Sequence, residues 1–327
     1  MARLLLLHTG GTLGMAPSGD PSSLAPGPYL DHVLERVPEL RDLAELQVEV
    51  PFNCDSASME PEQILGLATH IRGRAASFDG VVLIHGTDTM AFTASLLGFL
   101  LADLGKPVVI TGSQRPLSYV RSDARENLVD SVDLATRGVN EVGVVFGTRW
   151  LRGVATDKLS VHRYEAFDSP NLAPLAEIGM DLVIHPQAGK FERRMPQGFG
   201  GAFQSNIASY RPFPGMHWEL PPMSTRGVLI ETYGAGNLPM EREDLLLLLR
   251  HCRDRDLPVV ATTQCASGSV DLEAYELGRA LGTEGGISAG KHTRWSALAK
   301  LGLLLGADAG LETVREAFAT SWAGEPI

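Results

Sequence analysis

The chain has 327 residues, of which 44% are hydrophobic and 20% are charged. These proportions are typical of a protein with a substantial core, and the length suits about two domains. The formal net charge of −11 disfavours a surface that binds nucleic acid or anionic membranes, because phosphate groups are recognised by basic patches. The charge places no limit on a small-molecule substrate.

The cysteines and the N-terminal segment bear on the cellular compartment. Cys54, Cys252 and Cys265 show no paired spacing, which is typical of a reducing compartment and gives no metal-binding motif. The apolar run Leu4–Leu7 is shorter than the roughly 7–15 residues of a signal-peptide core. No segment approaches the roughly 18 apolar residues of a membrane helix. The sequence therefore predicts a cytoplasmic protein.

In the first half of the chain, short apolar runs alternate with amphipathic segments, which predicts βαβ units and a largely parallel sheet. The segment Gly14–Pro28 is rich in Gly, Pro and Ser; we expect it to be a mobile loop in the position of an active-site lid. The predicted strands are Leu4–Leu7, Gln47–Phe52, Val81–Ile84, Pro107–Thr111 and Val142–Phe146. The predicted helices are Tyr29–Val37, Pro61–Ala76, Thr89–Leu104 and Asp123–Thr136.

The composition changes to Gly, Pro, Gln and charged residues over 189–205, which predicts a linker between domains 1–188 and 206–327. We expect two α/β domains: a larger N-terminal one with a mostly parallel sheet flanked by helices, and a smaller flavodoxin- or Rossmann-like C-terminal one. The second domain's predicted elements are strands Gly227–Thr232 and Pro258–Thr263 and helices Met240–Arg253, Tyr275–Leu281 and Arg294–Leu304.

Polar residues follow four of the predicted strands. Thr12 and Thr87 each come after a short apolar run, and Asp55-Ser56 and Ser113-Gln114 follow two further strands. In open α/β sheets, ligands bind beyond the carboxyl ends of the strands. Asp88 beside Thr87 is either a site residue or a cap for the next helix, but capping alone does not require polar groups at four strand ends. The pattern favours hydrolysis through a threonine nucleophile.

A serine hydrolase is a weaker alternative. Gly286-Ile287-Ser288-Ala289-Gly290 matches the Gly-x-Ser-x-Gly string of the esterase nucleophile elbow, which needs a strand before the serine and a helix after it. Here the string follows the predicted helix Tyr275–Leu281 and a glycine-rich turn, with no apolar strand between them. A coincidental match is the favoured interpretation.

Several motifs resemble those of the L-asparaginase family, most closely its bacterial cytoplasmic type I branch. They include Thr9-Gly10-Gly11-Thr12, the eleven-residue string from Gly80 to Met90, Thr111-Gly112-Ser113-Gln114, and Tyr233-Gly234-Ala235-Gly236-Asn237. The resemblance covers nearly the whole chain. It implies hydrolysis of the side-chain amide of L-asparagine to L-aspartate and ammonia, without a metal or other cofactor, by a homodimer or homotetramer. Alternatives are a glutaminase, a lysophospholipase-type hydrolase, or a non-catalytic amino-acid-binding homologue.

The resemblance assigns roles to individual residues. Thr12 corresponds to the nucleophile that forms a β-acyl-enzyme, and Thr87, Asp88 and Lys158 correspond to a second catalytic group. A threonine hydroxyl is a poor nucleophile until a neighbouring base removes its proton. Thr87 can relay that proton toward Lys158, while Asp88 orients the lysine or the substrate ammonium.

The resemblance also implies a set of substrate-binding residues. Asp55 and Ser56 correspond to the groups that contact the α-amino and α-carboxylate ends of asparagine, together with Thr87 and Asp88. Ser113 corresponds to a residue that lines the pocket. A zwitterionic substrate explains why carboxylates and hydroxyls converge at one place.

The chain departs from the family pattern at the lid. The family has a lid tyrosine shortly after the nucleophile, whereas this stretch reads Ser18-Gly19-Asp20-Pro21-Ser22-Ser23. Tyr29 is the nearby tyrosine and a possible lid residue, although it also begins a predicted helix.

A second departure concerns regulation. Allosteric type I enzymes bind a second asparagine with an arginine and a threonine at the positions of Glu231 and Asp157 in this chain, although Cys265 is kept. Two carboxylates favour a cation over the α-carboxylate of asparagine. We therefore predict no activation by asparagine at this position.

Overall fold

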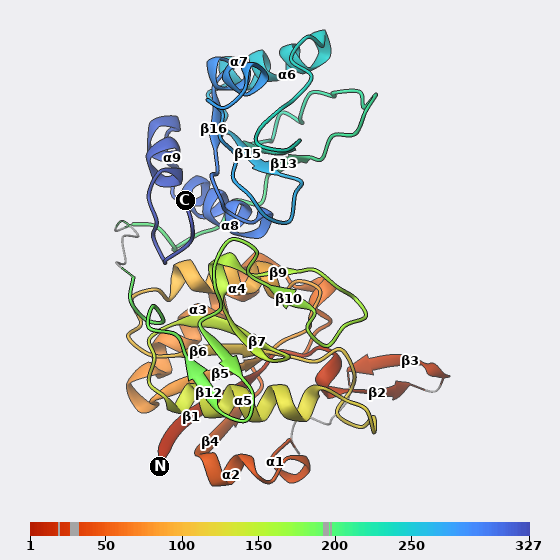
Figure 1. Ribbon diagram of the computed structural model, residues 1–327, viewed down its shortest axis with the longest axis vertical. Coiled ribbons are helices and arrows are strands. Elements are labelled where there is room, and N and C mark those ends of the chain that lie inside the picture. Colours follow the sequence, from red (N-terminus) through yellow and green to blue (C-terminus); the bar gives the residue numbers. More distant parts are fainter. Residues whose placement is uncertain (19, 27–32, 192–195, 197) are drawn as a thin grey trace. The chain divides into compact units, whose positions relative to one another are not determined.

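The computed structural model describes residues 1–18, 20–26, 33–191, 196 and 198–327 (Figure 1). The chain forms two compact units, one of Met1–Ser169 with Ala173–Phe191 and the other of Pro170–Leu172 with Glu192–Ile327. Each unit has its own sheet with helices around it, which confirms the predicted two α/β domains. The boundaries of the linker at 189–205 stay a prediction.

The first unit is built on an eight-stranded sheet in the order β12-β11-β8-β7-β6-β5-β1-β4. The pairings from β4 to β7 are parallel, as predicted, and those from β7 to β12 are antiparallel. The antiparallel strands escaped prediction because they are short and carry charged or partly exposed residues. The strands are β1 (Ala2–His8), β4 (Ala44–Glu49), β5 (Gly80–Ile84), β6 (Val108–Thr111), β7 (Val142–Phe146), β8 (Arg149–Arg152), β11 (Ala176–Ile178) and β12 (Leu182–Ile184).

The order of the parallel strands determines where a ligand crevice forms. Counted along the chain, β4-β1-β5-β6-β7 is the 2-1-3-4-5 order of flavodoxin-like sheets, in which the direction of winding reverses between β1 and β5. Ligands bind at this switch point, outside the carboxyl ends of the two strands. The register pairs His8 at the end of β1 with Ile84 at the end of β5, so the segments that carry Thr12 and Thr87 leave the sheet side by side.

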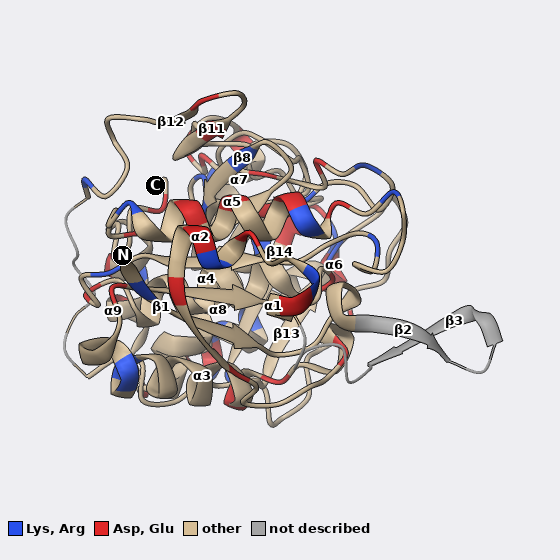
Figure 2. Ribbon diagram, turned by 90° about the horizontal axis from the view of Figure 1, so that it is seen from below, with Lys and Arg blue, Asp and Glu red and all other residues tan. Residues whose placement is uncertain are grey.

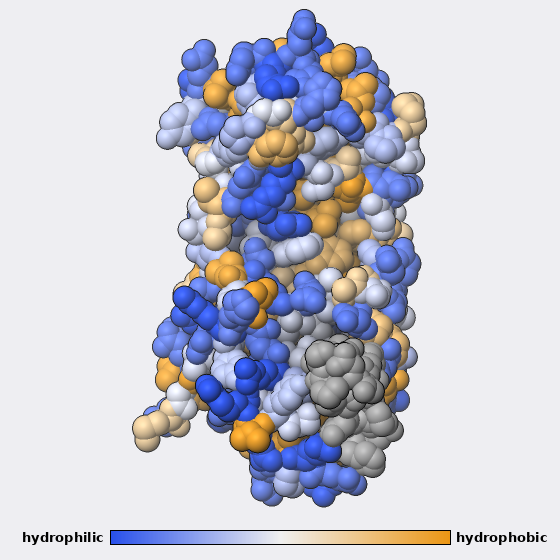
Figure 3. Space-filling view, turned by 90° about the vertical axis from the view of Figure 1, so that its right-hand side faces the viewer, coloured by the Kyte–Doolittle hydropathy of each residue, from blue (hydrophilic) through white to orange (hydrophobic). Residues whose placement is uncertain are grey.

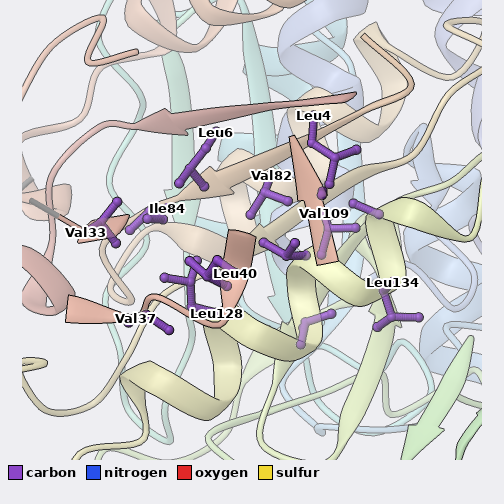
Figure 4. Packing of buried hydrophobic residues seen from close by; sticks show 14 of the residues in the cluster. Leu4, Leu6, Val33, Val37, Leu40, Val82, Ile84, Val109, Leu128 and Leu134 are labelled. Carbon is purple, nitrogen blue, oxygen red and sulfur yellow. The ribbon is translucent and has the colours of Figure 1, made fainter. Parts of the chain in front are cut away.

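Apolar residues from both layers form the core under this edge. Leu4 and Leu6 of β1 and Val82 of β5 are fully buried and belong to one cluster with Leu128 and Leu134 of α5 (Figure 4). Figure 1 shows α5 and α2 on one side of the sheet and α3 and α4 on the other. The helices are α1 (Val33–Arg36), α2 (Leu40–Leu43), α3 (Pro61–Arg74), α4 (Met90–Leu100) and α5 (Ala124–Thr136).

The charge distribution follows from this layering. The central strands β5, β6 and β7 contain no charged residue, as expected for parallel strands covered on both faces. Figure 2 shows charged residues on the helices and loops around largely uncharged strands.

The segment after Thr12 differs from the predicted mobile loop. It forms an antiparallel hairpin of β2 (Met15–Ser18) and β3 (Asp20–Pro26). The composition suggested a loop because proline disfavours strands that pair on both sides. Each strand of a two-stranded ribbon pairs on one side only, so it tolerates proline. Of the predicted helix Tyr29–Val37, residues 33–37 are described, and α1 covers Val33–Arg36 of them; Tyr29 itself lies outside the described residues.

The second unit contains a four-stranded sheet in the order β13-β14-β15-β16, parallel throughout. Gly286–Ser288 is strand β16, which the sequence interpretation did not predict; it is part of the Gly-x-Ser-x-Gly string itself. Among the described residues, no strand lies between α7 (Glu276–Thr283) and the string, as expected. Ser288 lies within this strand, and its hydroxyl donates to the Val270 carbonyl (2.6 Å). The elements are β13 (Ile207–Tyr210), β14 (Gly227–Thr232), β15 (Val259–Thr263), β16 (Gly286–Ser288), α6 (Glu243–Asp254), α7 (Glu276–Thr283), α8 (Arg294–Gly306) and α9 (Leu311–Phe318).

One face of the molecule illustrates the mixed character of its surface. On the face shown in Figure 3, hydrophobic residues occur in small groups among hydrophilic ones, which is normal for a folded domain. Among the helices of the described ranges, none is both long and apolar enough to cross a bilayer.

Candidate active site

Close backbone packing joins the loops that follow β1 and β5. Gly11 has a φ of +94°, and a Cβ atom there would lie 2.5 Å from the Cα of Gly86. Both the positive φ and the contact require glycine. The loop of Thr12 therefore lies directly against the loop of Thr87.

A third loop, after β4, packs into the same place. The Cys54 amide donates to the Thr9 carbonyl (3.0 Å), and a Cβ atom on Gly10 would lie 2.0 Å from the Cys54 carbonyl oxygen. A Cβ atom on Gly86 would lie 2.5 Å from the Ser56 hydroxyl oxygen. The glycines in the two sequence motifs thus let three strand ends converge.

Thr87, Asp88 and Lys158 meet in one hydrogen-bonded group. The Lys158 ammonium donates to the Thr87 hydroxyl (2.9 Å) and to the Asp88 carboxylate (2.8 Å). Thr87 is buried, and the Lys158 side chain is only 16% exposed. The alternative role of Asp88 as a helix cap is not observed, because α4 has Thr89 as its N-cap residue, without a side-chain capping bond.

Local structure holds Lys158 in this position. Lys158 lies in β9 (Asp157–Lys158), which pairs antiparallel with β10 (Phe167–Asp168), and the Asp157 carboxylate accepts the Lys158 amide (2.8 Å). The ladder fixes the backbone, so the flexible lysine stem needs to order only its own rotamers to reach Thr87.

The predicted substrate-binding residues Asp55 and Ser56 lie in the loop after β4. Ser56 is buried; its hydroxyl accepts the Asp88 amide (3.3 Å), and its carbonyl accepts the Thr89 hydroxyl (2.8 Å). Asp55 is exposed, and one of its carboxylate oxygens accepts the Ala57 amide (2.9 Å). The structure therefore joins Ser56 and Thr87 in one cluster of loops and leaves the Asp55 carboxylate open to solvent.

Thr12 and Ser113 are held less directly. Thr12 is half-buried at the start of a short 3-10 helix, Thr12–Gly14, and none of the described residues forms a hydrogen bond with its hydroxyl. Ser113 is buried, and its hydroxyl donates to the Arg115 carbonyl (2.7 Å). A Cβ atom on neighbouring Gly112 would lie 2.3 Å from the His85 carbonyl oxygen, so the loop of Ser113 packs on the same loop as Thr87.

Two histidines next to these loops had no role in the sequence interpretation. Burial and the neighbouring His85 lower the pKa of His8 to about 3, and burial lowers the pKa of His85 to about 4. Both imidazoles are therefore neutral at physiological pH. The available signal was that a histidine immediately precedes each threonine-bearing turn.

Glu231, in the second unit, has partners that the sequence did not reveal. Its side chain is 5% exposed, and its two carboxylate oxygens lie 3.3 Å from Arg211 and 3.7 Å from Arg294. The expectation that this carboxylate favours an added cation was wrong, because two guanidinium groups already neutralise it. Cys265 is exposed. Within the described part of the chain, no group of three or more His, Cys, Asp or Glu residues is arranged to hold a metal ion.

Comparison with protein families agrees with this architecture. Residues 3–189 match the model "Asparaginase, N-terminal", and residues 214–318 match "Glutaminase/Asparaginase C-terminal domain". The chain therefore belongs to the asparaginase family and is an amidohydrolase, as its motifs predict.

Individual relatives show how much of the chain is shared. The chain is 33% identical to L-asparaginase 1 of Escherichia coli K12, over 98% of this chain and 97% of that protein. It is 35% identical to the human 60 kDa lysophospholipase, over 93% of this chain but only 58% of that protein. The solved structure of the thermostable L-asparaginase from Thermococcus kodakarensis matches with a TM-score of 0.87 at 31% identity, over 99% of this chain and 98% of that one.

Proposed function

We propose that the protein hydrolyses the side-chain amide of L-asparagine to L-aspartate and ammonia, with Thr12 as the nucleophile. The observation that carries the proposal is the contact of the Lys158 side chain with both Thr87 and Asp88. Thr87 and Asp88 lie in the loop after β5, which packs against the loop of Thr12. Membership of the asparaginase family supports the reaction class.

The reaction proceeds in two balanced steps. The Thr12 hydroxyl oxygen attacks the amide carbon, its proton passes to the leaving nitrogen, and the C–N bond breaks to release ammonia and leave an ester on Thr12. Water then attacks the ester, aspartate leaves, and Thr12 regains its proton. Proton transfer by a positioned group contributes about 10²–10⁴-fold. In this proposal Lys158 acts in its neutral amine form: it takes the Thr12 proton through the Thr87 hydroxyl and returns it to the leaving nitrogen. The amides of Gly11 and Thr87 are candidates to stabilise the oxyanion, at about 3–4 kcal/mol for each donor.

Recognition of the substrate rests on charge. The exposed carboxylates of Asp55 and Asp88 suit an α-ammonium group; the Asp88 side chain is 65% exposed although it accepts from Lys158. Buried Ser113 and Ser56 add hydroxyls for the α-carboxylate end. Two carboxylates beside the catalytic threonines are poorly suited to a phosphate headgroup, which favours the amidase over a lysophospholipase despite the human relative.

Ammonia release from asparagine and from glutamine, with fatty-acid release from a lysophospholipid measured separately, tests the reaction. Release with asparagine, lost in Thr12→Ala and Thr87→Ala but not in the surface control Thr69→Ala, supports the proposal. Unchanged release in both site variants would exclude the threonine mechanism. Binding of aspartate by the wild type without turnover would identify a non-catalytic amino-acid-binding protein.

The activation of Thr12 needs its own experiment, because Tyr29, the possible lid residue, lies outside the described residues. Tyr29→Phe removes a hydroxyl and keeps the ring. A lower rate of ester formation on Thr12, followed by mass spectrometry of quenched reactions, would assign Tyr29 to the lid. An unchanged rate would assign the activation to Thr87 and Lys158.

We further infer a cytoplasmic homo-oligomer, a homodimer or homotetramer. The three unpaired cysteines support a reducing compartment. Light scattering of the purified protein measures the oligomeric state.

A further inference from the structure

Two buried histidines lie behind the loops of Thr12 and Thr87, outside the proposed chemistry. His8 is the last residue of β1, and His85 follows the last residue of β5; both are 1% exposed. The register pairs His8 with Ile84, so the two imidazoles stand one residue apart in register, on neighbouring strands.

His8 fixes the turn that leads to Thr12. Its Nδ1 atom accepts the backbone N–H of Gly10 at 2.8 Å. Gly10 and Gly11 have φ angles of +112° and +94°. Glycine adopts positive φ angles about as readily as negative ones, so it does not by itself favour this conformation. The imidazole bond therefore selects one conformation of an otherwise permissive segment.

His85 holds the equivalent turn on the neighbouring strand. Its Nδ1 lies 2.7 Å from the Gly86 carbonyl oxygen, and its Nε2 lies 3.0 Å from the Thr93 hydroxyl oxygen. Since a carbonyl only accepts, Nδ1 carries the proton and Nε2 accepts from Thr93. His8 must be the opposite tautomer, because its Nδ1 accepts an amide N–H.

Stability alone does not explain a histidine at position 8. Its Nε2 atom is buried and has no hydrogen-bond partner within the described residues, which costs about 1–3 kcal/mol for a buried donor. The preceding residues Leu4–Leu7 are fully buried and apolar, so a further apolar residue would suit the strand. The bond to Gly10 is what the imidazole adds.

We propose that His8 and His85 are positioning residues: His8 sets the nucleophile loop through Gly10, and His85 sets the loop of Thr87 through Gly86. Contact between Gly11 and Gly86 makes the two settings interdependent. The catalytic part of this inference rests on the proposed function. The structural part, two neutral imidazoles with opposite tautomers that hold two turns, does not.

Two variants of His8 separate positioning from packing. In His8→Asn, Oδ1 replaces Nδ1 on the same carbon and can accept the Gly10 N–H. His8→Phe keeps the ring but has no acceptor. We expect kcat for asparagine to stay within about threefold of the wild-type value in H8N and to fall about 10- to 100-fold in H8F, with KM little changed in both. A small misplacement of the reacting groups is enough to cause a loss of this size. Equal kcat in the two variants, at matched folded fractions, would overturn the proposal.

A spectroscopic measurement tests the inference without turnover. In ¹⁵N-labelled wild type at neutral pH, imidazole nitrogen shifts should show His8 protonated at Nε2 and His85 protonated at Nδ1. Faster hydrogen exchange of the Gly10 amide in H8F than in H8N should accompany this. Identical tautomers, or an imidazolium at either position, would refute the positioning roles even in an active enzyme. An inactive wild type with the expected tautomers would instead refute the proposed function alone.

Discussion

The Nζ atom of Lys158 lies 2.9 Å from the hydroxyl oxygen of Thr87, although 71 residues separate the two in the chain. The contact joins a short two-stranded ladder to the end of a central strand of the main sheet. Without this contact, Thr87 would be one more polar residue at the end of a strand. With it, the Thr87 hydroxyl has a partner that can exchange protons.

Lys158→Met should abolish most of the activity. The change keeps an unbranched side chain of similar length but removes the group that contacts Thr87 and Asp88, so we expect kcat for asparagine to fall about 10²–10⁴-fold. The matched control is Lys190→Met, at an exposed lysine of the same unit. Full activity in folded K158M, judged by its circular dichroism and melting temperature, would remove Lys158 from the mechanism.

Gly11→Ala tests the packing of the two loops. The added Cβ would sit 2.5 Å from the Gly86 Cα at a φ of +94°, so we expect a loss of stability of about 1–3 kcal/mol together with a loss of activity. The control is Gly66→Ala, within helix α3, where a Cβ meets nothing within 4 Å. There alanine should be neutral or should stabilise by about 0.5–1 kcal/mol. A G11A protein as stable and active as wild type would contradict the close packing.

Much of the site was predictable, because the chemistry is carried by residues next to recognisable strand ends. The motif at Thr87 could not disclose which lysine it binds, since the position of Lys158 depends on a ladder of two residues on each side. The hairpin after Thr12 was missed because its composition is that of a loop. His8 was missed because a single buried histidine in an apolar run has no periodic signature; only its bond to Gly10 reveals a role.

Buried histidines should make stability depend on pH. Burial lowers the pKa of His8, His85 and His292 to about 3, 4 and 4, from the usual 6.5 of a histidine; His85 adds to the effect at His8, and Lys300 adds to it at His292. Between about pH 6.5 and 4 the unfolded chain binds protons that the folded chain does not, so stability falls as the pH falls. Each histidine contributes about 1.4 kcal/mol for each pH unit in that window.

One carboxylate opposes this trend. Burial, with help from Glu126 and Asp133, raises the pKa of Asp130 to about 6, so its folded form binds a proton first and offsets part of the slope. Urea unfolding at several pH values from 4.5 to 7.5 measures the net slope, which we expect to be positive and to decrease in His8→Asn. A flat profile, or an unchanged slope in H8N, would contradict a neutral buried imidazole at position 8.

The ion pairs of Glu231 predict that asparagine does not activate the enzyme through the second unit. Arg211 and Arg294 occupy the two oxygens of this buried carboxylate, at a position where the allosteric relatives implied by the sequence have an arginine. Glu231 engages both guanidinium groups, so the α-carboxylate of a second asparagine would have to break these ion pairs before either arginine could bind it. We therefore expect a hyperbolic dependence of the initial rate on asparagine concentration. Sigmoidal kinetics that become hyperbolic in Glu231→Gln, with an exposed-site variant such as Glu241→Gln unaffected, would show that this position binds an effector after all.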